Sequence, residues 1–258
     1  MKIIRATKKD SSDIKEFLRK NDPEDYILNM IDHWLENDKV FIAVEDRIIG
    51  MNRLKYSLDG EAWLGGMRVN KNHRRKGIAS ILTVKCLAEA KTKKARLFTT
   101  ENNTAAFNHV WKMGFKIKGY YTMMYSEIGE EKYYEIKKGN VWERLKKSTI
   151  LRKNNFLLPQ SFTFYKIAQN LIKEAYISGG EYAIVERVNW GEDFFEITYF
   201  EGEKIIDGLK YLAFKNNHKK IWAFIPRDEN LTSILIKKGF KYEKWAKHGV
   251  VLEKALML

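Results

Sequence analysis

Residues 63–80, WLGGMRVNKNHRRKGIAS, contain an apolar strand pattern, a basic turn and the start of a helix. The strand pattern ends at Val69, the turn carries Arg-Arg-Lys at 74–76 and Gly77, and the helical pattern begins at Ile78. N–H groups in the first helical turn have no partner within the helix, and the helix dipole adds positive character there. Such a junction is a candidate phosphate site. The spacing alone is equally compatible with a plain surface connection.

The order Arg-x-x-Gly-x-Ala at residues 74–79 resembles the pyrophosphate-binding motif of the GNAT superfamily, the N-acetyltransferases that use acetyl-coenzyme A (acetyl-CoA). A second block, ENNTAAFNHVWKMGF at 101–115, resembles the closing pattern of that family, in which an asparagine precedes a helix and a Gly-Phe pair. The resemblance places a GNAT domain at residues 1–137. It implies an α+β fold with three layers, α/β/α, around a mixed and mostly antiparallel sheet.

Residues 138–258 repeat the latter half of the first pattern, and Gly-Phe at 239–240 echoes Gly-Phe at 114–115. We interpret them as a degenerate GNAT-like copy in a tandem arrangement. This half lacks the Arg-x-x-Gly-x-Ala order. Glu201 and Glu203 stand at the corresponding turn, where carboxylates would repel a pyrophosphate. An unrelated α+β domain with a chance Gly-Phe pair is the alternative.

Two local patterns predict helices. Asp22-Pro23 is expected to open a second helix, because proline is tolerated in the first helical turn. Residues 169–177 are also expected to be helical.

Composition narrows the class of protein. The 258 residues allow one large domain or two ordinary ones, and the single Cys86 excludes an internal disulfide. No apolar run approaches the roughly 20 residues that span a bilayer, and the N-terminus has no secretion signal, so we expect a cytoplasmic protein. The formal charge is +14, but lysines are scattered among glutamates, which favours a solvated surface over a nucleic-acid interface. No metal-ligand spacing occurs, and a homodimer is left open.

The resemblance implies a role for each part of the cofactor site. The main chain of Met67, Arg68 and Val69 would pair with the pantetheine arm, and the Met67 N–H would bind the thioester oxygen. Asn103 would bond the pantetheine amide, and Phe107 would pack beside it unless it is ordinary core. The pyrophosphate would be held by the basic turn and the first helical turn: Arg74, Arg75, Lys76, Gly77, Ile78, Ala79 and Ser80.

The catalytic acid and base are less well marked. Many members of the family have a tyrosine seven residues after the asparagine, and here that position is Val110, which cannot donate a proton. His109 would face another direction. The candidates are therefore Glu61 or Glu101 as the base, and Tyr121, Tyr120, Tyr125 or water as the acid.

Acidic residues occupy the loops that flank the acceptor site in this family, namely Asp22, Glu24 and Asp25, and Glu127, Glu130 and Glu131. An acidic rim would favour a cationic amine. The hypothesis is an N-acetyltransferase that transfers the acetyl group directly from acetyl-CoA to a primary amine, on a protein or a small cationic molecule. The alternatives are a non-catalytic acyl-CoA-binding sensor or assembly protein and, third, a nucleic-acid-associated protein.

Overall fold

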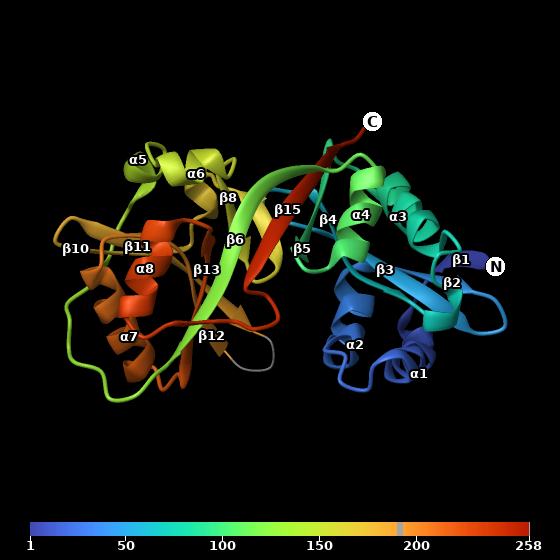
Figure 1. Ribbon diagram of the computed structural model, residues 1–258, viewed down its shortest axis with the longest axis horizontal. Helices are drawn as coiled ribbons and strands as arrows, with labels where there is room; N and C mark the ends of the chain where they lie inside the picture. The colour runs from blue at the N-terminus through green and yellow to red at the C-terminus, as the bar shows by residue number, and fades with distance from the viewer. Residues whose placement is uncertain (190–192, 258) are drawn as a thin grey trace. The chain divides into compact units, whose positions relative to one another are not determined.

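The computed structural model describes residues 1–189 and 193–257 (Figure 1). The chain forms two compact units. The first comprises residues 1–97, 105–116 and 253–258, and the second comprises residues 98–104 and 117–252.

These units differ from the division predicted between residues 137 and 138. Residues 117–137 pack within the second unit, although the sequence pattern groups them with the first domain. The boundary at 137 and 138, as a division between two tandem copies, stays a prediction.

The first unit is built on five strands in the order β1-β2-β3-β4-β5. All neighbours are antiparallel except β4 and β5, which are parallel. The strands are β1 (Lys2–Arg5), β2 (Lys39–Val44), β3 (Ile48–Tyr56), β4 (Ala62–Val69) and β5 (Lys94–Thr100). The helices are α1 (Ser11–Asn21), α2 (Ile27–Asn37), α3 (Ile78–Glu89) and α4 (Thr104–Lys112), with β5 and α4 extending into the second unit.

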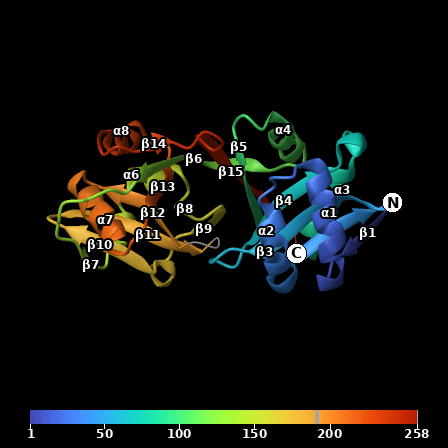
Figure 2. The same ribbon diagram turned by 90° about the horizontal axis from the view of Figure 1, so that it is seen from below.

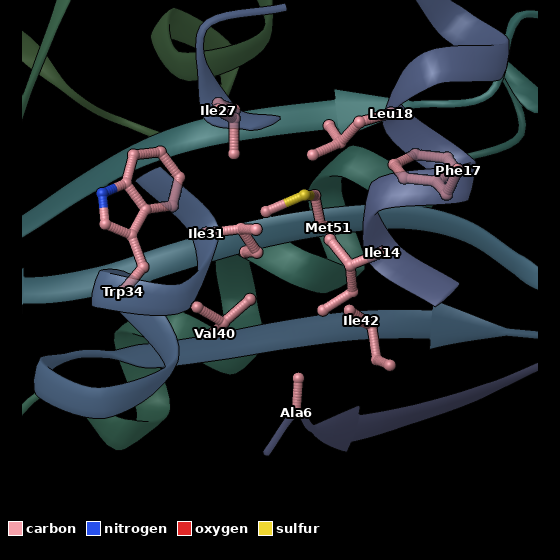
Figure 3. Close-up of a cluster of buried hydrophobic side chains, with 10 residues drawn as sticks. All are labelled: Ala6, Ile14, Phe17, Leu18, Ile27, Ile31, Trp34, Val40, Ile42 and Met51. Atoms are coloured by element: carbon pink, nitrogen blue, oxygen red, sulfur yellow. The ribbon is translucent and has the colours of Figure 1, made fainter. Parts of the chain in front are cut away.

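Helices cover both faces of this sheet (Figure 2). On one face, α1 and α2 bury a cluster that includes Leu18, Ile31 and Met51 (Figure 3). Neighbouring residues of a strand point to opposite faces. A Cβ on Gly50, next to Met51, would lie 3.0 Å from Cγ2 of Ile78, so α3 covers the other face. The three-layer arrangement is that predicted from the sequence.

The prediction for the start of the second helix was wrong. Helix α2 begins at Ile27, and Asp22-Pro23 lies in the turn before it. Asp22 is the C-cap of α1, and its N–H makes the last bond of the helix, to the carbonyl of Leu18 at 2.8 Å. Asp25 then accepts the N–H of Ile27 at 3.1 Å, which sets the helix start four residues later than the proline suggests.

The second unit contains the strand order β15-β6-β13-β12-β11-β10-β7 and a separate β8–β9 hairpin. The strands are β6 (Lys116–Glu127), β7 (Lys137–Lys138), β8 (Leu157–Gln160), β9 (Thr163–Lys166), β10 (Glu174–Ser178), β11 (Glu181–Asn189), β12 (Asp193–Glu201), β13 (Lys220–Pro226), β14 (Lys241–Tyr242) and β15 (His248–Ala255). The helices are α5 (Trp142–Leu145), α6 (Thr149–Lys153), α7 (Lys204–Lys215) and α8 (Glu229–Lys237).

The helix predicted over residues 169–177 is not formed. A short 3-10 turn is followed by β10, which pairs with β11 through a hairpin at Gly179 and Gly180. Both glycines have positive φ, 51° and 87°. A Gly-Gly pair is a hairpin signal, and the pairing that it allows outweighs the local helical pattern.

Strands β12 and β13 are parallel and are joined by α7, as β4 and β5 are parallel and are joined by α3. This shared β-α-β order agrees with a tandem arrangement.

Two glutamates are buried side by side in the second unit. Glu186 and Glu196 are paired across β11 and β12, and each is only 3% exposed. The hydroxyl of Tyr165 donates to Glu186 at 2.9 Å, and the N–H of Ser161 donates to Glu196 at 3.1 Å. Burial raises the pKa of Glu196 to about 8, with Glu186 as a further cause. Burial also raises the pKa of Glu186, against its bonds from Tyr165 and Gln160.

This pair predicts that stability falls as pH rises. Folded Glu196 stays protonated up to about pH 8, whereas an exposed glutamate ionises near pH 4.3, so the stabilisation is complete below about pH 4.3 and is lost toward pH 8. We expect Glu196→Gln to remove this loss. At about pH 9, the free energy of unfolding of the variant should exceed that of the wild type by up to about 1.4 kcal/mol for each unit of pKa shift. Urea unfolding at about pH 5 and about pH 9 measures it.

Glu143→Gln is the matched control, because that side chain is 75% exposed. Parallel pH profiles for the wild type and Glu196→Gln would contradict the prediction.

Candidate functional site

The turn after β4 is ordered by its own hydrogen bonds. Asn70 accepts the N–H of Asn72 on its side chain at 2.9 Å and the N–H of His73 on its carbonyl at 2.9 Å. The Nε of Arg74 donates to the carbonyl of Val69 at 3.3 Å. These bonds fold the turn back on the end of β4.

Two left-handed residues complete the turn. Arg75 has φ 61° and Gly77 has φ 80°. A positive φ is uncommon outside glycine, so Arg75 holds a conformation that the surrounding turn must impose. A Cβ built on Gly77 meets nothing within 4 Å. The space beside Gly77 is therefore open.

The N-terminus of α3 is left without a side-chain cap. Its N-cap is Gly77, and the first helical bond runs from the N–H of Ile81 to the Gly77 carbonyl at 3.1 Å. The N–H groups of Ile78, Ala79 and Ser80 precede that bond and have no acceptor within the helix. Together with the helix dipole they form an anion-binding end.

A bulge in β4 changes the direction of its main chain. Arg53 pairs with Gly65 and Met51 with Arg68, so two residues of β4 stand opposite Asn52. Gly66, inside the bulge, has φ 71°, and a Cβ there would lie 2.6 Å from the ring of Trp34. Only glycine fits this position without displacing that ring.

The end of β4 has an open edge. Asn70 N–H donates to β3, and hydrogen bonding alternates along an antiparallel strand, so Arg68 bonds β3 while Val69 and Met67 face away. On that side, the part of the chain that the structure describes shows pairing with β5 only at Ala62 and Trp63. The N–H groups of Met67 and Val69 thus face this edge, whereas their carbonyls accept side-chain donors, Nη1 of Arg68 at 3.1 Å and Nε of Arg74 at 3.3 Å.

The Arg68 side chain binds Asp25. Nε and Nη2 donate to the two carboxylate oxygens at 2.6 and 2.9 Å, and Asp25 is 5% exposed. Asp25 is therefore part of the support of β4 and not of an exposed acidic rim. Asp22 and Glu24 remain exposed.

Helix α4 carries no tyrosine at the expected place. Val110 is buried, and His109 approaches the hydroxyl of Thr83 on α3 at 3.1 Å. Desolvation lowers the pKa of His109. Phe107 stacks on Trp111 with ring centres 5.8 Å apart, at the surface of the helix. His109 accordingly connects two helices.

Glu61 lies at the wrong end of β4 for catalysis at Met67. The two are six residues apart, roughly 20 Å along a strand. The Glu61 carboxylate accepts the N–H of Lys94 at 3.0 Å. It fixes the start of β5, and the structure does not bring it near Met67.

The other two candidates belong to the second unit. Glu101 accepts Nη1 of Arg227 at 2.8 Å. Tyr121 is fully buried, and its hydroxyl donates to the carbonyl of Leu157 at 2.7 Å. Asn103 is in this unit too, with its N–H bonded to the Thr100 carbonyl at 3.0 Å.

Among the acidic residues of the last predicted loop, Glu127 and Glu131 are paired with Lys220 and Lys210 at 3.2 and 3.1 Å. Glu130 is exposed.

Sequence patterns gave no indication of Arg227 beside Glu101, because 126 residues separate them and no motif includes the arginine.

No helix in the described ranges is long and apolar enough to cross a membrane. Within the same residues, no group of three or more His, Cys, Asp or Glu side chains could hold a metal ion.

Residues 7–115 match the family model "Acetyltransferase (GNAT) family". They form a GNAT acetyltransferase domain. The match spans both blocks on which the resemblance depends and confirms it. Comparison with curated proteins gives no match.

Solved structures show that the fold likeness covers nearly the whole chain. A protein described as an acetyltransferase from Pyrococcus horikoshii is 16% identical, with TM-score 0.62 over 99% of this chain and 89% of that one. Another from Thermoplasma acidophilum is 15% identical, with TM-score 0.62 over 99% and 100%. A GCN5-related N-acetyltransferase from Sphaerobacter thermophilus is 9% identical, with TM-score 0.58 over 98% and 95%. At these identities the likeness confirms the fold class.

The support of β4 by Asp25 can be tested by substitution. Asp25→Asn removes the charge from a two-bond contact with Arg68, so we expect the free energy of unfolding to fall by about 2 kcal/mol. Chemical denaturation measures this, with the exposed Asp22→Asn as the control. Equal stability of the two variants would show that the contact does not hold β4.

Proposed function

We propose that this GNAT domain is an N-acetyltransferase that uses acetyl-CoA and transfers the acetyl group directly to a primary amine. The observation that carries the proposal is the uncapped N-terminus of α3 behind the left-handed residues Arg75 and Gly77. The N–H groups of residues 75–80 would bind the pyrophosphate, with Arg74 and Lys76 adding charge.

The open edge of β4 supports the position of the thioester. Met67 and Val69 would pair with the pantetheine amides as an added strand does. The Met67 N–H would then stabilise the negative charge that develops on the thioester oxygen. The amine nitrogen attacks the carbonyl carbon, the C–S bond breaks, and the thiolate takes up a proton.

Direct transfer agrees with the state of Cys86, the one cysteine of the chain. It is fully buried, and burial raises the pKa of its thiol to about 12. The thiol is therefore a poor nucleophile, and an acyl-cysteine intermediate is not expected.

Proton transfer would depend on water. Glu61, Glu101 and Tyr121 each hold a structural contact, and Val110 has no proton to give. A water molecule at the thioester would carry the proton from the amine and return one to the thiolate.

The acceptor would be an ammonium ion in solution, and it would release one proton to the solvent before its nitrogen attacks the thioester. Asp22 and Glu24 are exposed carboxylates in the loop between α1 and α2, which the family uses for the acceptor. Their charge favours the approach of an ammonium group on a small amine or a protein side chain.

Cofactor binding is tested by Gly77→Glu. The substitution places a carboxylate where the pyrophosphate would lie, and like charges in contact cost several kcal/mol, so affinity for acetyl-CoA should fall about a hundredfold or more. Isothermal titration measures it. Gly60→Glu is the matched control, because Gly60 also has a positive φ, 77°, with nothing within 4 Å of an added Cβ. Equal binding by both variants would remove the basis for the phosphate site.

A non-catalytic acyl-CoA-binding protein is the second candidate. It is favoured by the structural contacts of Glu61, Glu101 and Tyr121. For an acetyltransferase we expect thiol release from acetyl-CoA that depends on an amine and yields product 42 mass units heavier, roughly the mass of one added acetyl group. A mixed amine and peptide library provides the acceptors. Binding without turnover across the library would favour the sensor.

A further inference from the structure

A cavity with a volume of about 450 Å³ lies within the second unit, at the end of β12. This is an ordinary size for a small-molecule site. Its walls are the end of β12, the start of α8 and the segment that contains α5 and α6. The lining side chains that differ most in charge and polarity are Arg144, Lys147, Glu201, Leu231 and Ile234. None of them belongs to the turn or the strand edge described above as the candidate cofactor site.

The helix that follows β12 has its first turn occupied by the protein itself. Helix α7 follows β12 as α3 follows β4, but the N–H of Ile205 in its first turn donates to the Glu181 carboxylate at 2.7 Å. Helix α3 has no side-chain cap. A phosphate group at the start of α7 would meet the negative charge of Glu181, so the cavity is not a second phosphate site. Its ligand must be recognised by the side chains that line it.

The carboxylate of Glu201 is held in place at the cavity wall. The Tyr199 hydroxyl donates to its Oε1 at 2.9 Å, and Oγ of Ser148 lies 2.7 Å from the same hydroxyl. Because the proton of Tyr199 is used on Glu201, Ser148 donates to Tyr199. No salt bridge to Glu201 occurs among the residues that the structure describes. Its negative charge is therefore oriented but not neutralised.

Arg144 is the positive counterpart in the same cavity. Its guanidinium carbon lies 4.1 Å from the centre of the Tyr182 ring, and its Nη2 donates to the carbonyl of Gly180. Tyr182 stands opposite Glu201 in the pairing of β11 and β12, so Arg144 and Glu201 approach the same tyrosine. A guanidinium has five N–H donors, and most of those on Arg144 remain for a ligand. Neither Arg144 nor Lys147 forms a salt bridge within the described part of the chain.

The third part of the wall is apolar. Leu231 is buried, and Ile150 and Ile234 are half-buried. An aliphatic group that covers these side chains would leave water and gain the free energy of apolar burial. The cavity therefore combines one unneutralised anion, two unneutralised cations and an aliphatic wall.

We propose that this cavity binds a free α-amino acid with an aliphatic side chain. Glu201 accepts the ammonium group, and Arg144 binds the carboxylate, with Lys147 adding positive charge. The aliphatic side chain lies against Leu231 and Ile234. A simple anion would be repelled by Glu201, and a simple cation would be repelled by Arg144 and Lys147. A zwitterion is the ligand class that neutralises both ends, and this site is separate from the proposed acetyl transfer.

The experiment measures binding to the full chain by isothermal titration, with leucine as the probe. Leucinamide lacks the carboxylate, and 4-methylpentanoate lacks the ammonium group. Each should bind about tenfold or more weakly than leucine, because each loses a hydrogen bond between charged groups. Glycine lacks the aliphatic side chain and should also bind about tenfold or more weakly. Isoleucine and valine extend the set of aliphatic probes.

Two substitutions assign the two ends of the ligand. Glu201→Gln should weaken leucine about tenfold or more but should not weaken 4-methylpentanoate, which has no ammonium group to lose. Arg144→Met should weaken leucine in the same way but should not weaken leucinamide. Lys147→Met, at an exposed side chain, should also weaken leucine and not leucinamide, and it tests the carboxylate end if Arg144→Met does not fold.

Matched controls come from the same segment. Lys146 and Glu143 pair with each other at 2.7 Å and do not line the cavity. Lys146→Met and Glu143→Gln should therefore bind leucine as the wild type does. Circular dichroism without ligand shows whether each variant is folded.

Three results would overturn the amino-acid site. The first is no saturable binding of leucine, isoleucine or valine by the wild type at millimolar concentrations. The second is equal binding of leucine and its two analogues, since the charged ends would then not be recognised. The third is a folded Glu201→Gln variant that binds leucine as tightly as the wild type. None of these results depends on whether the first unit binds acetyl-CoA.

Discussion

The left-handed turn between β4 and α3 is the constraint on which the candidate site depends. Arg75 and Gly77 both adopt positive φ, which an L-residue such as arginine adopts at a cost of about 1 kcal/mol. The turn lets α3 begin directly behind β4 with its first N–H groups uncapped. A serine or aspartate at the N-cap would bond those groups itself. Glycine leaves them to a ligand and leaves room for it.

The rest of the first unit holds this turn at the end of an open strand. The bulge at Gly66 depends on close contact with Trp34, and Asp25 anchors the neighbouring Arg68 with two short bonds. The α1–α2 loop and α2 therefore hold β4 from one face of the sheet, while α3 covers the other face, where it packs on Gly50 of the neighbouring β3. Packing from both faces lets β4 continue to Val69, although its described pairing with β5 covers only Ala62 and Trp63.

The sequence predicted correctly those parts of the structure that depend on consecutive residues. The basic turn, Gly77 and α3 stand where the spacing indicated, because consecutive residues determine a turn and the start of a helix. The helix expected over residues 169–177 failed, because strand pairing across the Gly179-Gly180 hairpin outweighs the helical pattern of those residues. The acid and base assignments depended on side-chain contacts that no spacing encodes, such as Glu61 with Lys94 or Glu101 with Arg227.

Those contacts limit which of the candidate side chains can act as an acid or a base. Glu61 holds the start of β5, Glu101 binds Arg227, and the Tyr121 hydroxyl donates to a buried carbonyl. What the first unit offers near Met67 is mainly main chain: donors for an oxyanion and an edge for an extended ligand. Acyl transfer from a thioester needs little more, because the leaving thiolate is stable and a deprotonated amine is a strong nucleophile. The proposed acetyl transfer therefore depends mainly on how precisely the cofactor is positioned.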